Sequence, residues 1–282
     1  MNVSVILPAA GRGARFAEGG GKGRKLEAEL GGKAVLMRSV ELFTGRPEVG
    51  EVIVAVAPEE LAGFKFKWGD KLGFLGVRVV AGGEAERWET VGRALGEVSG
   101  ESTHVAVHDA ARPVTATETI DRVFEAAGRW EAVAPGFAVS ETLKLVSEAP
   151  AESEEEADPL DAILGSAGKR EVRGYAVERT VSRRGLWAIQ TPQVFEAGLL
   201  REAYGRIASG EVETGEITDD AGLVEAMGRT VHVVEGDGLN VKITRPGDLS
   251  FAAAVVGMRE GGSSEGLGPK RKFPTWAESE ED

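Results

Sequence analysis

A short segment near the start of the chain combines glycines with basic side chains. The residues ILPAAGRGARF (6–16) include Gly11 and Gly13, whose lack of a side chain lets backbone N–H groups approach an anion closely. Basic side chains beside such a loop can stabilise the negative charge that develops during transfer at phosphorus. The candidate cations are Arg12 or Arg15 within the loop and Lys22, Arg24 or Lys25 after it.

Neither of the two common phosphate-binding fingerprints fits this loop. A dinucleotide fingerprint requires a third glycine, and this chain has Phe16 at that place. A Walker loop requires Gly-Lys followed by Ser or Thr, whereas Lys22 is followed by Gly23. The remaining interpretations are a nucleotide-binding loop of another class and an ordinary glycine-rich connection between a strand and a helix.

The composition allows a substantial core without covalent cross-links. With 282 residues, 42% of them hydrophobic, the chain is long enough for one large domain or two small ones. It contains no cysteine, which excludes disulfides, thiolate zinc sites and cysteine nucleophiles. No apolar run approaches the roughly 20 residues of a membrane span, and no signal-peptide pattern begins the chain. We therefore expect a cytoplasmic protein that does not enter a membrane.

The net charge of −13 is unevenly distributed along the chain. Residues 147–161 carry seven acidic side chains and no basic one, and residues 259–282 carry six acidic and four basic side chains. The rest of the chain therefore has a net charge of only −4. Local groups of arginine and lysine can still bind phosphates there, but a broad basic surface for nucleic acid is not expected.

Apolar patterns in the first half of the chain predict alternating strands and helices. Short β-branched runs predict strands at 3–7, 52–56, 77–80 and 105–107. Apolar residues at helical spacing follow three of these runs, in sets that begin with Leu36, Val91 and Ile120. Such alternation is typical of βαβ units. We therefore predict an α/β fold with a Rossmann-like, mostly parallel sheet and helices on both faces.

The alternation stops after Glu131. The segments 131–146 and 172–181 look extended, so we predict a protruding two-stranded β-arm over about 138–187. The acidic residues 147–171 within it have the composition of a solvated insertion. Later patterns predict helices around 199–207, 223–227 and 251–258 and a strand at 231–234. The expected organisation is one domain over 1–260 with a flexible tail over 261–282.

Four later motifs accompany the first loop: VHDAARPV (107–114), AIQTPQVF (188–195), ITDDAGLVEAMG (217–228) and NVKITRPGDL (240–249). In order and approximate spacing, they and LPAAGRGARF resemble the 2-C-methyl-D-erythritol 4-phosphate cytidylyltransferase family. The resemblance runs from about residue 3 to residue 258, apart from the acidic insertion. It implies a nucleotidyltransferase of the non-mevalonate isoprenoid pathway, which joins CTP to methylerythritol phosphate, releases pyrophosphate and uses Mg2+ as its divalent cation.

The residue types present suit the reaction that this resemblance implies. A phosphate monoester oxygen attacks the α-phosphorus, and its second pKa of about 6 leaves it largely ionised near neutral pH. No general base is required, and the histidines His104, His108 and His232 are not spaced as metal ligands. The reaction instead needs cations, a metal ion and accurate positioning.

The resemblance assigns roles to individual residues. Arg15 and Lys25 would stabilise the charge on the pentacoordinate phosphorus and on the leaving pyrophosphate. Lys242 would hold the incoming substrate phosphate together with Arg183, for which Arg184 is a rival. The residues that would bind the nucleotide are Ala9, Ala10, Gly11, Gly13, Gly83, Arg87 and Thr90.

Asp109 is the acidic residue for which the resemblance implies a role near the magnesium ion and the substrate. Its position alone would favour a helix cap or a turn. Arg112 and Thr142 would contact the erythritol portion. The arm would carry Thr142 and Arg183 into the partner's active site, so the resemblance implies a homodimer. The implied ligands are CTP and a polyol phosphate, with no nucleic acid.

The chain departs from the family pattern near Lys25. Relatives bring this lysine in through Pro-Lys-Gln, whereas this chain has GRKLE, so Arg24 could share the role and the loop is expected to close only over CTP. Leu239 stands where many relatives have an acid, and GGEAERWET (82–90) is one residue longer than usual. Two alternatives stay open, a ribitol 5-phosphate cytidylyltransferase and a nucleotide-binding homologue with impaired catalysis.

Overall fold

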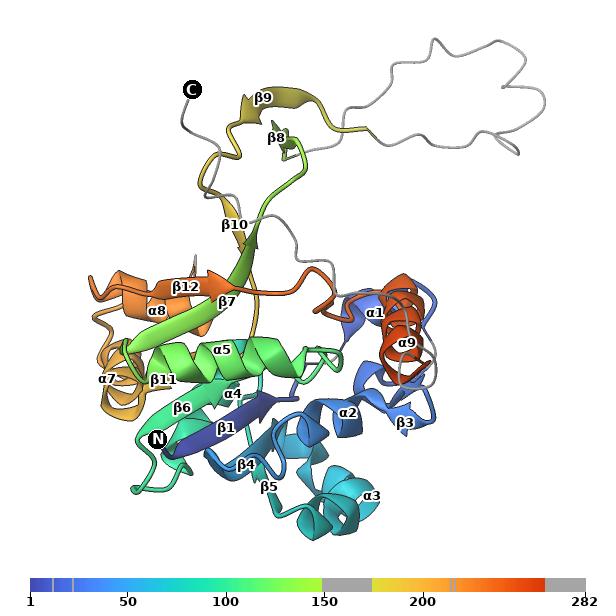
Figure 1. The fold of residues 1–282 in the computed structure, drawn as a ribbon, viewed down its shortest axis with the longest axis vertical. Coiled ribbons are helices and arrows are strands. Elements are labelled where there is room, and N and C mark those ends of the chain that lie inside the picture. The colour runs from blue at the N-terminus through green and yellow to red at the C-terminus, as the bar shows by residue number, and fades with distance from the viewer. Residues whose placement is uncertain (12, 22, 149–173, 214, 216, 262–282) are drawn as a thin grey trace, which may run out of the picture. The chain divides into compact units, whose positions relative to one another are not determined.

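The computed structural model describes residues 1–11, 13–21, 23–148, 174–213, 215 and 217–261 (Figure 1). These residues divide into two compact units. The larger unit comprises Met1–Gly136 and the chain from Ile189 onward, and the smaller comprises Phe137–Ala188. No helix in the described ranges is both long and apolar enough to cross a membrane.

A central sheet organises the larger unit (Figure 1). Its strand order is β10-β7-β11-β6-β1-β4-β5, and β12 pairs with β7. The strands are β1 (Val3–Pro8), β4 (Val49–Val56), β5 (Val77–Ala81), β6 (His104–Val107), β7 (Ala132–Ala138), β10 (Trp187–Ile189), β11 (Gln193–Glu196) and β12 (His232–Glu235). The pairs β1–β4, β1–β6, β4–β5 and β7–β12 are parallel. β11 is antiparallel to its two neighbours, β6 and β7. The predicted mostly parallel sheet is confirmed.

Helices cover both faces of this sheet, as the alternation predicts. Successive side chains of a strand point to opposite faces, and in β1 Val5 and Ile6 belong to different hydrophobic clusters. The cluster of Val5 includes side chains from α2 (Val35–Glu41), α3 (Leu61–Phe74) and α5 (Thr117–Ala127). The cluster of Ile6 includes side chains from α4 (Arg87–Gly96), α7 (Ala197–Ala208) and α8 (Asp220–Ala226).

A third cluster supports the segments that follow β1 and precede the last helix. Phe16 of α1 (Ala14–Glu18) packs with Ile243 and with Val255 of α9 (Pro246–Gly261), and α1 and α9 lie side by side in Figure 1. The short elements between them in sequence are η1 (Lys25–Glu27), β2 (Glu29–Leu30), β3 (Lys33–Ala34) and η2 (Pro58–Glu60). This packing brings residues near position 15 and near position 242 together, although they are far apart in sequence.

The smaller unit contains a two-stranded antiparallel sheet, as predicted for the arm. β8 (Leu143–Val146) pairs with β9 (Val177–Val181), with Leu143 opposite Val181. Of the acidic insertion predicted over 147–171, residues 149–171 lie outside the described residues, as does the tail from 262 to 282.

The helix α3 and the strand β11 are among the elements that do not appear in the sequence expectations. In α3, Phe64, Trp68 and Leu72 are buried, but Phe66 and Phe74 are 96% and 91% exposed, so its apolar residues do not form a single stripe. β11 has only four residues and follows Pro192, and short apolar runs do not distinguish a strand from a helix.

Candidate active site

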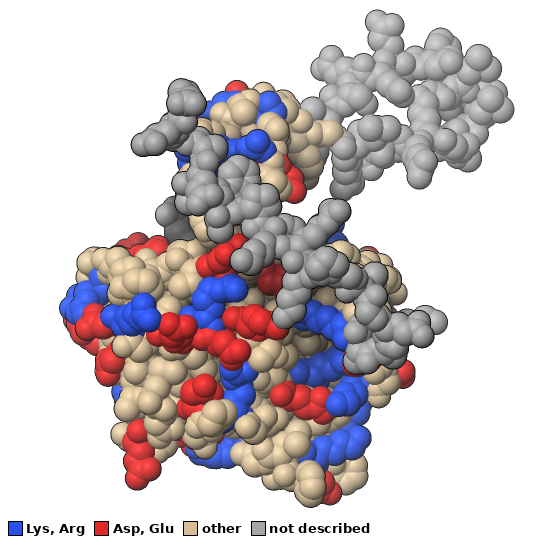
Figure 2. All heavy atoms as spheres, viewed as in Figure 1, with Lys and Arg blue, Asp and Glu red and all other residues tan. Residues whose placement is uncertain are grey.

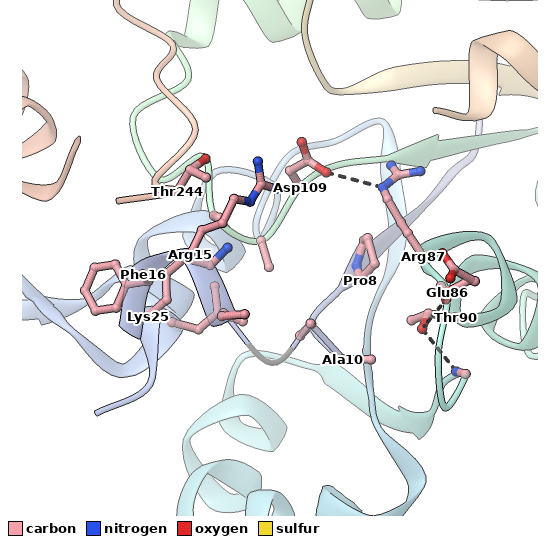
Figure 3. A pocket seen from close by; sticks show the side chains of 18 of the residues that line it. Pro8, Ala10, Arg15, Phe16, Lys25, Glu86, Arg87, Thr90, Asp109 and Thr244 are labelled. Carbon is pink, nitrogen blue, oxygen red and sulfur yellow. Dashed lines mark hydrogen bonds and ion pairs between the residues drawn. The ribbon is translucent and has the colours of Figure 1, made fainter. Parts of the chain in front are cut away.

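The site lies where β1 and β6 end. These neighbouring strands are parallel and in register, with Ile6 opposite Val107, so the residues that follow them meet at the same edge of the sheet. Ligands of open α/β sheets bind outside the carboxyl ends of the strands. A cavity of about 570 Å³ opens here, between the loop after Pro8, the segment after β5, and Asp109 (Figure 3).

Most of the residues predicted from the motifs line this cavity. The predicted nucleotide-binding residues Ala9, Ala10, Gly11, Gly13, Gly83, Arg87 and Thr90 all belong to its wall. So do Arg15, Lys25, Lys242 and Asp109. Segments that are more than 200 residues apart in sequence therefore contribute cations to the same cavity.

Figure 2 shows one face of the molecule, on which basic and acidic side chains are interspersed over the described surface.

The loop after β1 presents Lys25, and not Arg24, to the cavity. Gly13 has a positive φ of 66°, and a Cβ placed on it would lie 3.7 Å from Cβ of Lys25. The guanidinium of Arg24 pairs instead with Glu60, and Lys67 pairs with Glu27 at 2.7 Å. These two ion pairs connect the segment around Lys25 to η2 and α3. Arg12 and Lys22, the other candidate cations, lie outside the described residues.

The segment after β5 approaches the start of α4 too closely for any side chain at Gly83. A Cβ on Gly83 would lie 2.4 Å from Cβ of Glu89 and 2.8 Å from N of Thr90. Its N–H donates to Oγ1 of Thr90 at 3.1 Å, an interaction drawn in Figure 3. Glu86 and Glu89 form a capping box, which fixes the helix start and with it the places of Arg87 and Thr90.

Asp109 is surrounded by three cations. Its Oδ2 lies 2.9 Å from Nζ of Lys242 and 3.3 Å from Nε of Arg112, and its Oδ1 lies 3.5 Å from Nε of Arg87. Burial acts to raise the pKa of this carboxyl, but Lys242, Arg87 and Arg112 outweigh it and hold the pKa well below its ordinary value. Asp109 is therefore ionised and keeps the cations in place.

Lys25 is placed among charges of its own sign. Burial and the neighbouring Lys242 lower the pKa of Lys25, and Asp109 only partly opposes them. A buried lysine beside other cations is stabilised when a further anion binds next to it, so this arrangement suits an anionic ligand.

A model of the IspD family, described as 2-C-methyl-D-erythritol 4-phosphate cytidylyltransferase, matches residues 3–158 and 160–258. The chain belongs to this family. The enzyme of that name from Acidobacterium capsulatum is 36% identical over 263 residues, which cover 92% of this chain and 99% of the relative. The one from Frankia casuarinae is 39% identical over 256 residues, which cover 90% of this chain and 81% of the relative.

Solved structures of the family share the fold. The crystal structure of the Thermus thermophilus enzyme is 32% identical, with a TM-score of 0.65, and the match covers 91% of this chain and 99% of that one. The Anaerococcus prevotii structure has a TM-score of 0.68 at 25% identity and covers 90% of this chain and 95% of that one. The resemblance read from the motifs is thus confirmed, and so is the enzyme class, a nucleotidyltransferase.

Three predicted residues are absent from the wall of this cavity. Arg112 is partly buried and donates to Asp109 and, at 2.7 Å, to the carbonyl of Asn240. Burial lowers the pKa of Arg112, with Asp109 opposing. Thr142 and Arg183 belong to the smaller unit, where the Arg183 carbonyl accepts a hydrogen bond from N of Leu186. The roles of all three residues stay predictions.

The sequence motifs gave no role to Asp220, which the structure places beside Arg87. Oδ2 of Asp220 lies 2.7 Å from Nη1 of Arg87, and Oδ1 accepts from the Tyr204 hydroxyl at 2.6 Å. Burial lowers the pKa of Arg87, but Asp220 and Asp109 outweigh it and raise that pKa above its ordinary value. Either aspartate of the motif ITDDAGLVEAMG could cap the helix that follows. Asp219 fills that role, and nothing in the motif indicates that Asp220 instead pairs with an arginine.

Proposed function

We infer that the chain transfers the cytidylyl group of CTP to 2-C-methyl-D-erythritol 4-phosphate. The products are pyrophosphate and 4-diphosphocytidyl-2-C-methyl-D-erythritol, an intermediate of the non-mevalonate isoprenoid pathway. The observation that carries this inference is the cavity itself. In a member of this family, it joins a glycine-rich loop to the cations Arg15, Lys25, Arg87 and Lys242.

The nucleotide occupies the side of the cavity formed by the two glycine-containing segments. Gly11 and Gly13 let backbone groups approach the triphosphate, and Gly83 does the same near the base and ribose. Arg87 and Thr90 complete this side, with Arg87 held between two carboxylates. Fixed donors of this kind orient the α-phosphorus for attack.

Catalysis consists of positioning and charge stabilisation. The attacking monoester oxygen is already ionised near neutral pH, because its second pKa is about 6. None of the described side chains that line the cavity is a histidine, which agrees with a reaction that needs no general base. Arg15 and Lys25 stabilise the charge that develops on the α-phosphate and on the leaving pyrophosphate.

A divalent cation, magnesium, fits the carboxylate that the cavity provides. The described residues contain no cluster of three acidic or histidine side chains, but Mg2+ commonly binds through one or two carboxylates together with substrate phosphates. Asp109 is ionised and lines the cavity, so it is the residue that would hold the ion. When bound, the ion would neutralise charge on the triphosphate.

Lys242 receives the phosphate of the incoming polyol, and the arm completes the site in a homodimer. Lys242 Nζ is paired with Asp109 but the side chain remains 40% exposed, so it is available to a ligand. Arg183 and Thr142 of a second copy would contact the same substrate, with Arg112 near its erythritol portion. We place the reaction in the cytoplasm, where both substrates of such an enzyme would be found.

Pyrophosphate release tests this function. The protein is supplied with CTP, Mg2+ and 2-C-methyl-D-erythritol 4-phosphate, and with ribitol 5-phosphate, ATP or UTP in parallel. Release is expected only with CTP and methylerythritol phosphate. The variant Lys242→Gln should lose it, whereas Arg245→Gln, three residues away and exposed, should keep it. Faster release with ribitol 5-phosphate would show that ribitol 5-phosphate is the substrate instead. CTP binding without any pyrophosphate release would show that the protein binds the nucleotide but is impaired in catalysis.

A further inference from the structure

Two phenylalanine side chains protrude from the helix α3, which packs beside the edge strand β5 (Figure 1). Phe66 is 96% exposed and Phe74 is 91% exposed, so almost nothing in the described chain covers either ring. Single exposed apolar residues are normal on a protein surface, but a bare aromatic ring exposes a large apolar area to water. Two such rings on one helix therefore favour a partner that removes them from water.

Both rings point away from the core of the larger unit. Successive residues of an α-helix turn by about 100°, so Phe66 lies about 160° around α3 from the buried Trp68. Phe74 lies about 120° from Trp68 in the other direction. Gly63 and Gly73 lie on the same outer side, where a Cβ on either would meet nothing within 4 Å. The two rings therefore stand above a low, open helix surface.

Lysines flank the two rings on both sides of the helix. Lys65 lies about 60° from Trp68 on one side, and Lys71 lies about 60° from it on the other. Within the described chain neither lysine forms an ion pair, although Nζ of Lys71 lies 5.5 Å from the centre of the Trp68 ring. Lys67 lies on the same side as Lys71 and pairs with Glu27 at 2.7 Å. The outer surface of α3 is thus apolar in the middle and positive along its flanks.

The local charge of α3 is opposite in sign to that of the whole chain. Asp70, its one acidic residue, lies between the two rings, but three lysines outnumber it and give the helix a net charge of +2. The chain as a whole has a net charge of −13. Exposed charges more than about 8–10 Å apart are largely screened at physiological ionic strength. The charges of α3 itself therefore decide what this surface attracts at contact.

The charge and shape of this surface favour an anionic lipid bilayer over a protein partner. A second copy of the chain would bring the lysines of two α3 helices together, and like charges across an interface repel. A bound peptide occupies a groove, whereas rings as bare as Phe66 and Phe74 are not enclosed by one. A bilayer accepts protruding apolar side chains at the boundary between headgroups and acyl chains, where lysines meet anionic headgroups.

We propose that α3 binds to the surface of an anionic lipid bilayer. Phe66 and Phe74 enter the boundary between headgroups and acyl chains, and Lys65 and Lys71 lie against the headgroups on either side. The helix lies along the surface and does not span the bilayer. No residue of α3 belongs to the wall of the catalytic cavity, so the inference does not depend on the function proposed above.

Vesicle sedimentation tests the proposal on the full chain. Vesicles of phosphatidylcholine alone are compared with vesicles that also contain about 30% phosphatidylglycerol, an anionic lipid. We expect binding to the anionic vesicles, little binding to the neutral ones, and a loss of binding at about 0.5 M salt because salt screens the attraction. Equal binding to both kinds of vesicle, or no binding to the anionic ones, would overturn the proposal.

The double variant Phe66→Ser with Phe74→Ser removes the apolar part of the surface. We expect the partition coefficient for anionic vesicles to fall by at least about tenfold. Pyrophosphate release should not change, and the melting temperature should not fall, because both rings are bare in the folded protein.

The matched control is Phe251→Ser with Met258→Ser on α9. These side chains are 47% and 68% exposed, and α9 contains no lysine. The control should bind vesicles as the wild type does. An equal loss of binding in the two double variants would show that α3 is not the contact and would refute the inference.

Substitutions of the charged residues test the electrostatic part. Lys65→Gln with Lys71→Gln should lower the partition coefficient by about tenfold or more, because each lysine near an anionic surface contributes about fivefold. Asp70→Asn removes the negative charge between the rings and should raise the partition coefficient by about fivefold. Weaker binding of Asp70→Asn would contradict the placement of this residue against the headgroups.

A fluorescent probe locates the contact directly. The chain has no cysteine, so Gly73→Cys provides a single site for an environment-sensitive dye. Its emission should shift to the blue on anionic vesicles, whereas the same dye on Gly96→Cys, at an equally open position, should not respond. A shift at Gly96 alone would place the contact elsewhere and refute the proposal. A molecular mass that falls in Phe66→Ser with Phe74→Ser, without vesicle binding by the wild type, would assign the surface to a second copy instead.

Discussion

Oδ2 of Asp109 lies 2.9 Å from Nζ of Lys242, and this ion pair joins the end of β6 to the segment before α9. The side chain of Asp109 is 10% exposed, whereas that of Lys242 is 40% exposed. Both side chains line the cavity, but the carboxylate is largely enclosed by the protein, whereas the ammonium group is open to a ligand. The carboxylate orders a cation that would otherwise be free to turn into solvent, and it does so without shielding that cation from a ligand.

Replacing Asp109 by asparagine should abolish most of the activity. The amide keeps the shape but leaves Lys242, Arg87 and Arg112 without their shared anion, so we expect kcat/KM to fall at least about a hundredfold. The measurement is pyrophosphate release under saturating CTP. Asp121→Asn, on the exposed side of α5 and paired with Arg46, is the control and should retain wild-type kinetics. Equal activity of the two variants would contradict this role.

The same substitution should have a stability effect that depends on pH. Because the folded pKa of Asp109 is depressed, its contribution is fully present above the unfolded pKa of about 3.9 and is lost as the pH falls through the folded value. We expect the wild type to exceed Asp109→Asn by about 1–3 kcal/mol between pH 5 and 8, with a smaller difference below pH 4. Urea unfolding at several pH values measures this. A difference that grows on acidification would contradict the assignment.

The motifs predicted the residues that line the cavity better than the buried residues that hold them in place. Ala9, Gly13, Arg15 and Gly83 could be identified because glycines and cations that follow the ends of strands are typical of phosphate-binding loops. Asp220 could not, because the sequence does not distinguish an aspartate that is buried beside an arginine from one that caps a helix. Burial of a polar side chain follows from tertiary packing, which one sequence does not display.

The strands of the sheet also differ in how well the sequence predicts them. β1, β4, β5 and β6 are β-branched runs in a sheet covered on both faces, and a continuous apolar run predicts such strands. β11 has the antiparallel direction, because it enters between β6 and β7 after a long excursion through the smaller unit. No local feature of QVFE specifies that direction.

Gly83→Ala should weaken CTP binding. The added Cβ would meet Glu89 at 2.4 Å and N of Thr90 at 2.8 Å, so the segment after β5 must shift away from α4. We expect the KM for CTP to rise about tenfold or more. Gly96→Ala, at the end of the same helix with nothing within 4 Å, is the control and should stabilise the protein by about 0.5–1 kcal/mol. Unchanged CTP kinetics in Gly83→Ala would show that this segment does not bind the nucleotide.

Lys25→Met should separate activity from stability. Burial and Lys242 lower the pKa of Lys25, so the folded protein holds its charge less favourably than the unfolded chain does. Methionine removes that charge and keeps an unbranched side chain, and we expect the melting temperature to rise by about 2–4 °C or stay unchanged. Pyrophosphate release should fall by at least about a hundredfold, because no other described cation takes the place of Lys25 over the triphosphate.

Arg24→Met provides the matched comparison on the neighbouring residue. Arg24 is half exposed and pairs with Glu60, away from the wall of the cavity, so its loss should change kcat and KM by less than about threefold. The two variants differ by one position in the loop GRKLE, and the assay is the same for both. A large loss of pyrophosphate release in Arg24→Met with little loss in Lys25→Met would show that Arg24, and not Lys25, stabilises the charge on the triphosphate. It would also mean that the loop rearranges around CTP, with Arg24 leaving Glu60 to reach the triphosphate.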